Sequence, residues 1–243
     1  MTPLDSSAVH CTGIRKHFGE DDARVEVLRG VAYTVRRGEL SFLVGPSGCG
    51  KTTLISVIAG LLETSSGEVS LFGNHLARMP HPERVLFRRS HLGFVFQQYN
   101  LLQALTAAEN AAIPLLAAGI RRREAVDRAA ALLDRLGLGS KTGSYPRQLS
   151  GGQQQMLALA KAVMLEPKLL CIDELSLGLA PVVVQDLLKI VEKLKEQGVT
   201  MVIVEQSVNV ALSIADRAVF MERGQVKFEG PAQELLERDD LLR

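Results

Sequence analysis

The chain has 243 residues, and its 28 lysines and arginines against 27 aspartates and glutamates give a formal net charge of +1 at pH 7. This balance argues against a protein that binds nucleic acid by bulk charge, which normally shows a basic excess. The hydrophobic fraction of 47% and the charged fraction of 23% are ordinary for a folded globular protein. The length suits one large domain, or one domain with an inserted lobe.

Composition also predicts a protein of the reduced cytoplasm. No apolar run approaches the ~18–20 residues that a membrane span requires, and residues 1–5 show no basic start of a secretory signal. Cys11, Cys49 and Cys171 are too far apart in the sequence to indicate a disulfide framework or a cluster of metal ligands. The absence of tryptophan and the 5% aromatic content argue against a surface for base stacking, so we expect no nucleic-acid partner.

The first half of the chain reads mainly as short strands. Residues 39–44 form an apolar run that predicts a buried strand, and this run leads through a glycine-rich turn into a predicted helix at 52–62. A charged stretch at 78–91 carries no clear pattern. The other predicted strands, separated by turns rich in glycine and charge, are 9–14, 25–28, 33–35 and 67–72.

The second half begins with an alanine- and leucine-rich region at about 106–148. One helix face is predicted there, because apolar residues recur at helical spacing at Ala125, Ala129, Leu132, Leu133 and Leu136. From residue 168 onward strands and helices alternate, which predicts a parallel sheet with crossover helices and makes the helical region an inserted lobe. The predicted strands are 169–172, 200–204 and 218–221, and the predicted helices are 182–196 and 207–215.

A phosphate-binding loop is predicted between the strand at 39–44 and the helix after it. The segment fits the pattern GxxxxGK[ST], whose glycines let backbone N–H groups converge on phosphate oxygens at a helix N-terminus. Lys51 would bridge the β- and γ-phosphates, the Thr52 hydroxyl would ligate Mg²⁺, and Thr53 could donate to another phosphate oxygen. A chance match has odds of about one in a hundred for this length. The matching residues are Gly45, Pro46, Ser47, Gly48, Cys49, Gly50, Lys51 and Thr52.

Two acidic residues follow the apolar strand at 169–172. Ligands in open α/β sheets bind at the C-terminal ends of the strands, so Asp173 is expected to reach Mg²⁺ directly or through water, and Glu174 to polarise the attacking water. An acidic pair after a strand, taken alone, is more often a helix N-cap. With a phosphate-binding loop in the same chain, the catalytic interpretation is favoured.

The segment Leu149-Ser150-Gly151-Gly152-Gln153 opens a helix predicted to run to about residue 165. Ser150 and Gln153 have the spacing of a capping box. That interpretation leaves the two glycines unexplained, because each costs a helix about 1 kcal/mol relative to alanine. Close approach of bare backbone N–H groups to an anion would explain them, which predicts a second phosphate-binding helix N-terminus.

With these motifs together, the sequence resembles an ATP-binding-cassette (ABC) ATPase over essentially its whole length. GPSGCGKTT, FQQYNLL, LSGGQ and the strand ending in Asp173-Glu174 carry the resemblance. It implies an α/β fold: a P-loop NTPase core with a parallel sheet, an N-terminal antiparallel β subdomain and an inserted α-helical lobe. The whole chain, 1–243, would be one ATPase domain, with residues 1–97 and 166–243 as the core and 98–165 as the helical lobe.

The resemblance also implies site roles and a dimer. Two such ATPase subunits, identical or different, would pair head to tail and enclose two ATP molecules with Mg²⁺. Ser150, Gly151, Gly152 and Gln153 would then act on the nucleotide held by the partner. Gln97 matches the glutamine that contacts Mg²⁺ and the water, and Phe18 matches the aromatic that stacks on adenine; Phe18 alone would sooner be assigned to core packing.

Three positions depart from the usual pattern of this family. Gln206 stands at the switch position where most relatives have histidine; glutamine can bond a γ-phosphate but cannot become a cation. Ala180 replaces the usual aspartate of the loop after Glu174, and Leu175 replaces the usual proline. These changes affect the expected rate and the coupling between sites, though not nucleotide binding.

The motifs point to two branches of the family. Up to about residue 155 the chain resembles the lipoprotein-release and macrolide-export branch, and from about residue 156 the branched-chain amino-acid import branch. We expect an ATPase subunit at the cytoplasmic face of the inner membrane, driving a separate integral-membrane permease, with an export type favoured by the front half. The alternatives are a non-transport ABC scaffold, and a recombined nucleotide binder with impaired turnover.

Overall fold

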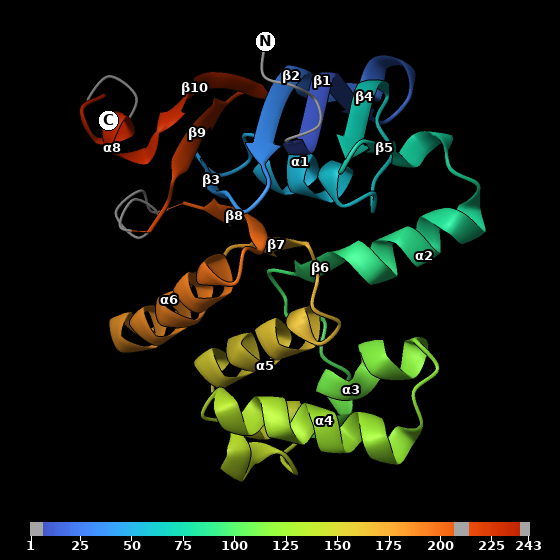
Figure 1. Cartoon of the computed structure of the whole chain (residues 1–243). Helices are drawn as coiled ribbons and strands as arrows, with labels where there is room; N and C mark the ends of the chain where they lie inside the picture. Colours follow the sequence, from blue (N-terminus) through green and yellow to red (C-terminus); the bar gives the residue numbers. More distant parts are fainter. Residues whose placement is uncertain (1–6, 207–213, 239–243) are drawn as a thin grey trace.

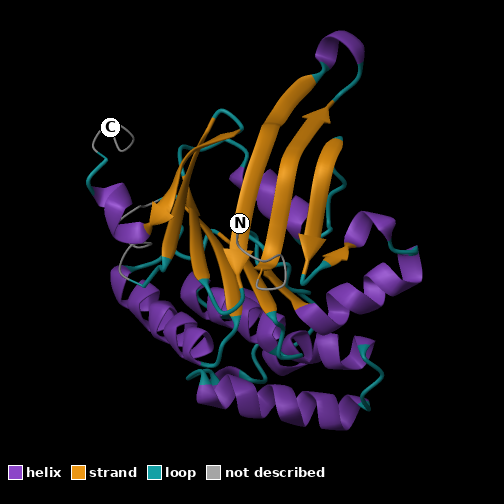
Figure 2. Cartoon of the chain, turned by 45° about the horizontal axis from the view of Figure 1, so that its top comes forward, coloured by secondary structure: helices purple, strands orange, loops and turns teal. Residues whose placement is uncertain are grey.

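The computed structural model describes residues 7–206 and 214–238, and two sheets form its framework (Figures 1 and 2). A four-stranded antiparallel sheet has the strand order β2-β1-β4-β5, and a six-stranded sheet has the order β10-β9-β3-β8-β7-β6. In the larger sheet all neighbours are parallel except β10, which pairs antiparallel with β9.

The bounds of the elements follow in chain order. The strands are β1 (Ser7–Phe18), β2 (Val25–Arg36), β3 (Leu40–Val44), β4 (Ser66–Leu71), β5 (Asn74–His75), β6 (Leu92–Val95), β7 (Leu169–Asp173), β8 (Thr200–Glu205), β9 (Arg217–Glu222) and β10 (Gln225–Pro231). The α-helices are α1 (Lys51–Ile58), α2 (His81–His91), α3 (Ala107–Ala117), α4 (Arg122–Arg135), α5 (Gly151–Val163), α6 (Pro181–Glu196) and α8 (Ala232–Leu236).

Both faces of the parallel sheet are covered, which explains why its strands are apolar along their whole length. Every residue of β3 is buried. Leu40, Phe42 and Val44 face a cluster that includes α3, α4, α5 and α6, whereas Leu43 faces α1 and the antiparallel sheet. The predicted α/β class, with a parallel core, an antiparallel β subdomain and a helical layer, is confirmed. Within the described ranges, no helix is both long and apolar enough to cross a membrane.

The first two strands are longer than predicted. The sequence suggests three short runs, but β1 and β2 are continuous strands of 12 residues each. Their pairing register shifts between Cys11 and Ile14 and again between Ile14 and Arg15. Gly13 and Gly30 lie at these shifts with φ values of 60° and 79°. Gly30, which falls in a predicted turn, and Gly13, which lies inside the predicted strand 9–14, are therefore at β-bulges, which bend a strand without ending it.

Other element boundaries also differ from the prediction. Helix α1 ends at Ile58 and not at residue 62, and α5 ends at Val163 and not near 165. The charged stretch 78–91 contains α2, whose half-buried face consists of Arg84, Phe87, Arg88 and His91, so only one residue of this face is apolar. Strands β6 and β10 were not predicted. Most of the helix predicted at 207–215 lies outside the described residues.

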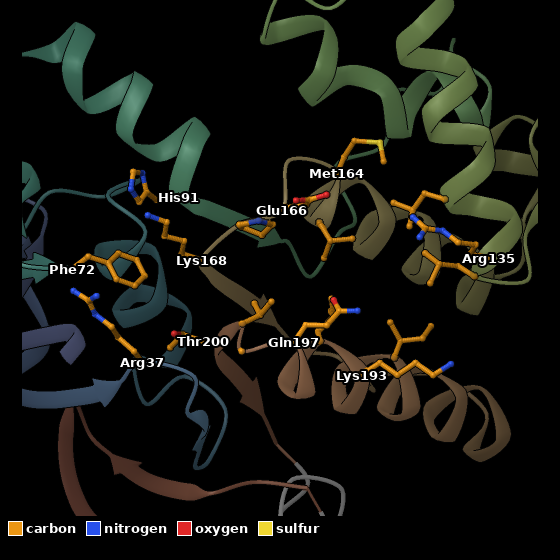
Figure 3. Close-up of a pocket in the computed structure, with 18 of the residues that line it drawn as sticks. Arg37, Phe72, His91, Arg135, Met164, Glu166, Lys168, Lys193, Gln197 and Thr200 are labelled. Carbon is orange, nitrogen blue, oxygen red and sulfur yellow. The ribbon is translucent and has the colours of Figure 1, made fainter. Parts of the chain in front are cut away.

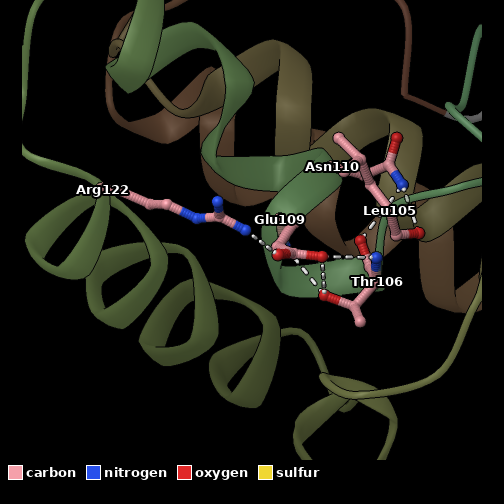
Figure 4. Close-up of polar contacts among 5 residues, drawn as sticks. All are labelled: Leu105, Thr106, Glu109, Asn110 and Arg122. Atoms are coloured by element: carbon pink, nitrogen blue, oxygen red, sulfur yellow. Dashed lines mark hydrogen bonds and ion pairs between the residues drawn. The ribbon is translucent and has the colours of Figure 1, made fainter.

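A polar network organises the start of the helical layer (Figure 4). The fully buried side chain of Asn110 accepts from the backbone N–H of Leu102 at 2.8 Å and donates to the carbonyl oxygens of Leu102, Leu105 and Thr106. Thr106 caps α3 with Glu109, which also pairs with Arg122 of α4. The hydrogen bond from the Thr106 backbone N–H, followed by that from Arg122, lowers the pKa of Glu109. The network therefore fixes the loop that leads from β6 into α3.

Candidate functional site

Most of the predicted site residues lie where four neighbouring parallel strands end. Strands β3, β8, β7 and β6 lie side by side in that order. The loop after β3 is the predicted phosphate-binding loop, β8 is followed by Gln206, β7 ends in Asp173 before Glu174, and β6 is followed closely by Gln97. Segments far apart in the sequence therefore meet at one edge of the sheet, the edge where open α/β sheets bind ligands.

The loop after β3 has a backbone that its glycines make possible. Gly45 has a φ of 145°, and a Cβ built on it would lie 2.1 Å from the carbonyl oxygen of Met221. Gly50 has a φ of 104° and is the N-cap of α1, whose first residue is Lys51. The loop thus leads directly into a helix N-terminus, where free N–H groups and the helix dipole favour an anion.

Lys51 is folded back over this loop. Its Nζ donates to the carbonyl oxygens of Gly45 at 2.7 Å and Pro46 at 2.9 Å, and the residue is only 5% exposed. The ammonium group is thereby held in the concavity of the loop, with carbonyl oxygens as neighbours that a phosphate could replace. Thr52 and Thr53 follow it in the first turn of α1.

Thr52 and Asp173 meet across the sheet. The Thr52 hydroxyl donates to Oδ1 of Asp173 at 3.1 Å, and Asp173 is buried. Burial raises the pKa of Asp173, whereas the hydrogen bond from Thr52 acts in the opposite direction. Among the residues that the structure describes, no group of three or more His, Cys, Asp or Glu side chains could hold a metal. A hydroxyl beside one carboxylate fits Mg²⁺, which takes one or two protein oxygens and completes its shell with phosphate and water.

Glu174 is held by two glutamines from opposite sides. Gln97 Nε2 donates to Oε2 at 2.7 Å, and Gln206 Nε2 donates to Oε1 at 2.5 Å. Glu174 has a φ of 62°, a conformation that non-glycine residues seldom adopt. Both carboxylate oxygens are thus oriented. Gln97, also predicted as a metal ligand, contacts Glu174 and has no hydrogen bond to the Thr52–Asp173 pair in the described part of the chain.

The segment 149–153 shows one of its two predicted features, the capping box. Ser150 and Gln153 form a capping box at the start of α5, as their spacing suggests. Gly152 has a reason within the chain, because a Cβ there would lie 2.4 Å from Cγ1 of Val183 in α6. Ser150 and Gly151 are exposed, and no described hydrogen bond joins them to the loop at 45–52. Their predicted contact with a phosphate of a partner's nucleotide stays a prediction.

Phe18 lies at the end of β1 and is 44% exposed, so the assignment to core packing is wrong. The Nζ of Lys16 lies 5.1 Å from the centre of its ring. Because Phe18 is exposed, its ring can stack on another planar group. Its contact with adenine stays a prediction.

Two polar residues at this edge were not found from the sequence. Glu205, the last residue of β8, accepts from the backbone N–H and the hydroxyl of Ser176. Gln155 in α5 donates to the carbonyl oxygens of Glu174 and Leu175 at 3.4 and 3.3 Å. Both residues are buried. The signal available in the sequence for Glu205 was an acidic residue at the end of an apolar run.

A groove of about 1020 Å³ lies away from these residues (Figure 3). It is lined by Lys168, just before β7, and by Thr200, the first residue of β8, and is therefore at the opposite edge of the sheet. Arg37, Lys168 and Lys193 line it, and it includes none of the predicted site residues.

The geometry can be compared with known proteins. A family model described as "ABC transporter" matches residues 28–176. The chain is 37% identical to methionine import ATP-binding protein MetN 1 of Rhodococcus jostii over 94% of its own length and 68% of that protein. It is 39% identical to macrolide export ATP-binding/permease protein MacB 1 of Aeromonas hydrophila, over 88% of its own length and 33% of that protein.

The chain thus spans 68% of one import relative, 59% of another from Brucella abortus, and a third of the export relative. Among solved structures it matches a dimeric ATP-binding cassette in a post-hydrolysis state with ADP and phosphate, with a TM-score of 0.86 and 30% identity over 92% of this chain and 98% of that one. It also matches a nucleotide-free cassette from an ABC transporter, with a TM-score of 0.83 and 27% identity over 98% of both chains.

Proposed function

The chain belongs to the ATP-binding-cassette transporter ATPase family, and on that premise we propose that it binds and hydrolyses MgATP as one half of a head-to-tail dimer that drives a membrane permease. The observation that carries the proposal is the edge formed by β3, β8, β7 and β6. It brings a phosphate-binding loop, a hydroxyl–carboxylate pair and a doubly held glutamate together.

The residues divide the work of hydrolysis among them. The backbone N–H groups at 47–51 and the Lys51 ammonium bind the β- and γ-phosphates, and Phe18 stacks on adenine. Thr52 and Asp173, with Gln97 nearby, would hold Mg²⁺, and the ion would supply positive charge against the phosphate oxygens. Glu174 accepts a proton from the attacking water while the water oxygen bonds to the γ-phosphorus. The bond between the γ-phosphorus and the ADP oxygen breaks, and ADP leaves in line. Gln97 and Gln206 keep both Glu174 oxygens oriented for that transfer.

A second chain completes the site in this proposal. Ser150 and Gly151 are exposed at the N-terminus of α5 and have no described hydrogen bond to the phosphate-binding loop of their own chain. A helix N-terminus favours phosphate, and a matched cassette of 30% identity is dimeric with ADP and phosphate bound. The segment 150–153 of one chain would therefore contact the nucleotide on the loop of its partner.

Sedimentation of a Glu174→Gln variant tests the dimer. We expect a monomer without nucleotide and a dimer with MgATP, because blocked hydrolysis leaves the closed state in place. A Ser150→Arg change in the same variant should abolish the dimer but leave ATP binding, since it crowds only the partner's phosphate. A monomer in MgATP, with ATP bound, would contradict the head-to-tail site.

We further propose that the permease is a separate chain and that this ATPase lies against it at the cytoplasmic face of the membrane. The relatives include import and export proteins by name. The loop from Gln97 to α3 and the helices at 98–165 would face the permease, and this front half resembles the export branch. We therefore favour an export-type permease. Stimulation of the ATPase by such a permease in liposomes, and not by an import type, would support this choice.

Impaired turnover is the second candidate, because Gln206 donates to Glu174 but cannot carry a positive charge. A histidine there could become a cation beside both Glu174 and the γ-phosphate. If Gln206 limits the rate, the Gln206→His variant should raise kcat for ATP several-fold with little change in KM. Steady-state phosphate release at saturating MgATP measures this, and an unchanged or lower kcat would exclude Gln206 as the cause of slow turnover.

A further inference from the structure

Glu205 is a buried acid that has no cationic partner among the described residues. It ends β8 and is 2% exposed, and no ion pair of the described chain includes it. Burial raises its pKa, and the adjacent charge of Glu174 acts in the same direction. A buried carboxylate costs folding free energy unless its hydrogen bonds compensate. An apolar residue at this position would avoid that cost in folding free energy. The hydrogen bonds of Glu205 are therefore what distinguishes it from an apolar side chain.

Those bonds are directed at the loop that follows Glu174. Oε1 of Glu205 accepts from the backbone N–H of Ser176 at 2.8 Å, and Oε2 accepts from the Ser176 hydroxyl at 3.0 Å. The backbone N–H of Gln206 also hydrogen-bonds to this carboxylate. One side chain therefore contacts the residue two positions after Glu174 and the residue that donates to Glu174.

Apart from the bonds to Glu205, few described hydrogen bonds connect this loop to β8. The backbone N–H of Glu174 donates to the carbonyl oxygen of Val204 at 3.1 Å, and Glu174 has a left-handed φ. Beyond Ser176 the residues 177 and 178 are exposed, and Gly178 has a φ of 71°. Without the Glu205 clamp, the described hydrogen bonds that join this loop to β8 and Gln206 would all be at Glu174.

We propose that Glu205 is a positioning residue that fixes the Glu174 loop against the Gln206 switch, and so sets the hydrogen bond from Gln206 to Glu174 on which turnover depends. This inference rests on the proposed ATPase function. Because β8 lies beside β7 in the sheet, its last residue, Glu205, lies next to the loop that follows β7 and directly precedes Gln206. Misplacing a catalytic group by about 1 Å can cost up to ~100-fold in rate.

The test is a set of variants assayed for kcat, KM and ATP affinity. Glu205→Ala should lower kcat about 10- to 100-fold, while the Kd for MgATP stays within about threefold. Glu205→Gln should retain most of the rate, because its Oε1 can accept from the Ser176 N–H and its Nε2 can donate to the Ser176 hydroxyl. Ser176→Ala removes one of the two bonds and should lower kcat less than Glu205→Ala does.

The same changes in a Gln206→Ala background distinguish positioning from a general structural role. If Glu205 acts through Gln206, neither Glu205→Ala nor Ser176→Ala should lower kcat further in that background. A loss of equal factor in both backgrounds would overturn the inference, as would a full rate in Glu205→Ala. If Glu205→Ala does not fold, Ser176→Ala alone decides in the same way. Absence of ATPase activity in the unchanged protein would instead contradict the proposed function.

Discussion

Replacement of Glu174 by glutamine is expected to lower ATP turnover at least ~100-fold and to leave ATP binding intact, the scale expected for loss of a positioned base. Glutamine has nearly the same shape, but its neutral amide cannot accept the proton of the attacking water. Gln97 and Gln206 donate to the two carboxylate oxygens, and one of these amides can turn to accept from the new NH₂ group. The variant should therefore keep the local structure and lose only the proton acceptor.

Single-turnover phosphate release, with ATP affinity measured in parallel, checks this result. Glu196→Gln is a matched control, because Glu196 is an exposed acid at the end of α6, away from the strand ends that carry the site. The control should hydrolyse ATP at the unchanged rate. Full turnover by the Glu174 variant would show that another group accepts the proton.

Replacement of Lys51 by alanine should weaken MgATP binding by at least ~100-fold. The β- and γ-phosphates would both lose their hydrogen bonds to the ammonium. Charge-assisted hydrogen bonds contribute about 1.5–3 kcal/mol each, and about 1.4 kcal/mol corresponds to a tenfold change in affinity. The same group now donates to the carbonyl oxygens of Gly45 and Pro46. Because a phosphate would replace these two oxygens, the expected loss of affinity comes from the missing ammonium.

A fluorescence titration with a nucleotide analogue measures the Lys51 effect, and circular dichroism during heating shows whether the fold persists. Lys193→Ala serves as the matched control, because Lys193 is an exposed lysine on α6 at the opposite edge of the sheet. The control should bind nucleotide normally. Undiminished binding by the Lys51 variant would refute the assignment of residues 45–52 as the phosphate-binding loop.

Local sequence patterns were enough for the elements whose cause is local. The apolar runs at 39–44 and 169–172 predict strands because buried parallel strands are apolar on both faces, and β3 and β7 are entirely buried. The spacing of Ala125, Ala129 and Leu133 predicts the buried face of α4. The capping box of Ser150 and Gln153 also follows from spacing alone.

Long-range pairing decided what those patterns could not. Gly13 and Gly30 have the residue type of turns, but pairing of β1 with β2 makes them bulges. Gly152 has a packing reason that depends on Val183, 31 positions later in the chain. The half-buried face of α2 is mostly charged, with Phe87 as its one apolar residue, so a run of apolar residues at helical spacing did not mark this helix in the sequence.

The sequence by itself determined which groups this protein brings to the site: the predicted phosphate-binding loop, the acids Asp173 and Glu174 at the end of β7, and the glutamines, since each residue type has its own donors and acceptors. Only the tertiary structure decided how these groups meet. The order β3-β8-β7-β6 places β8, which Gln206 follows, between β3, which leads into the predicted phosphate-binding loop, and β7, which ends in Asp173. Glu174 thus receives one glutamine from each side, and Glu205 reaches Ser176, because strand order depends on crossovers and packing that no local pattern records.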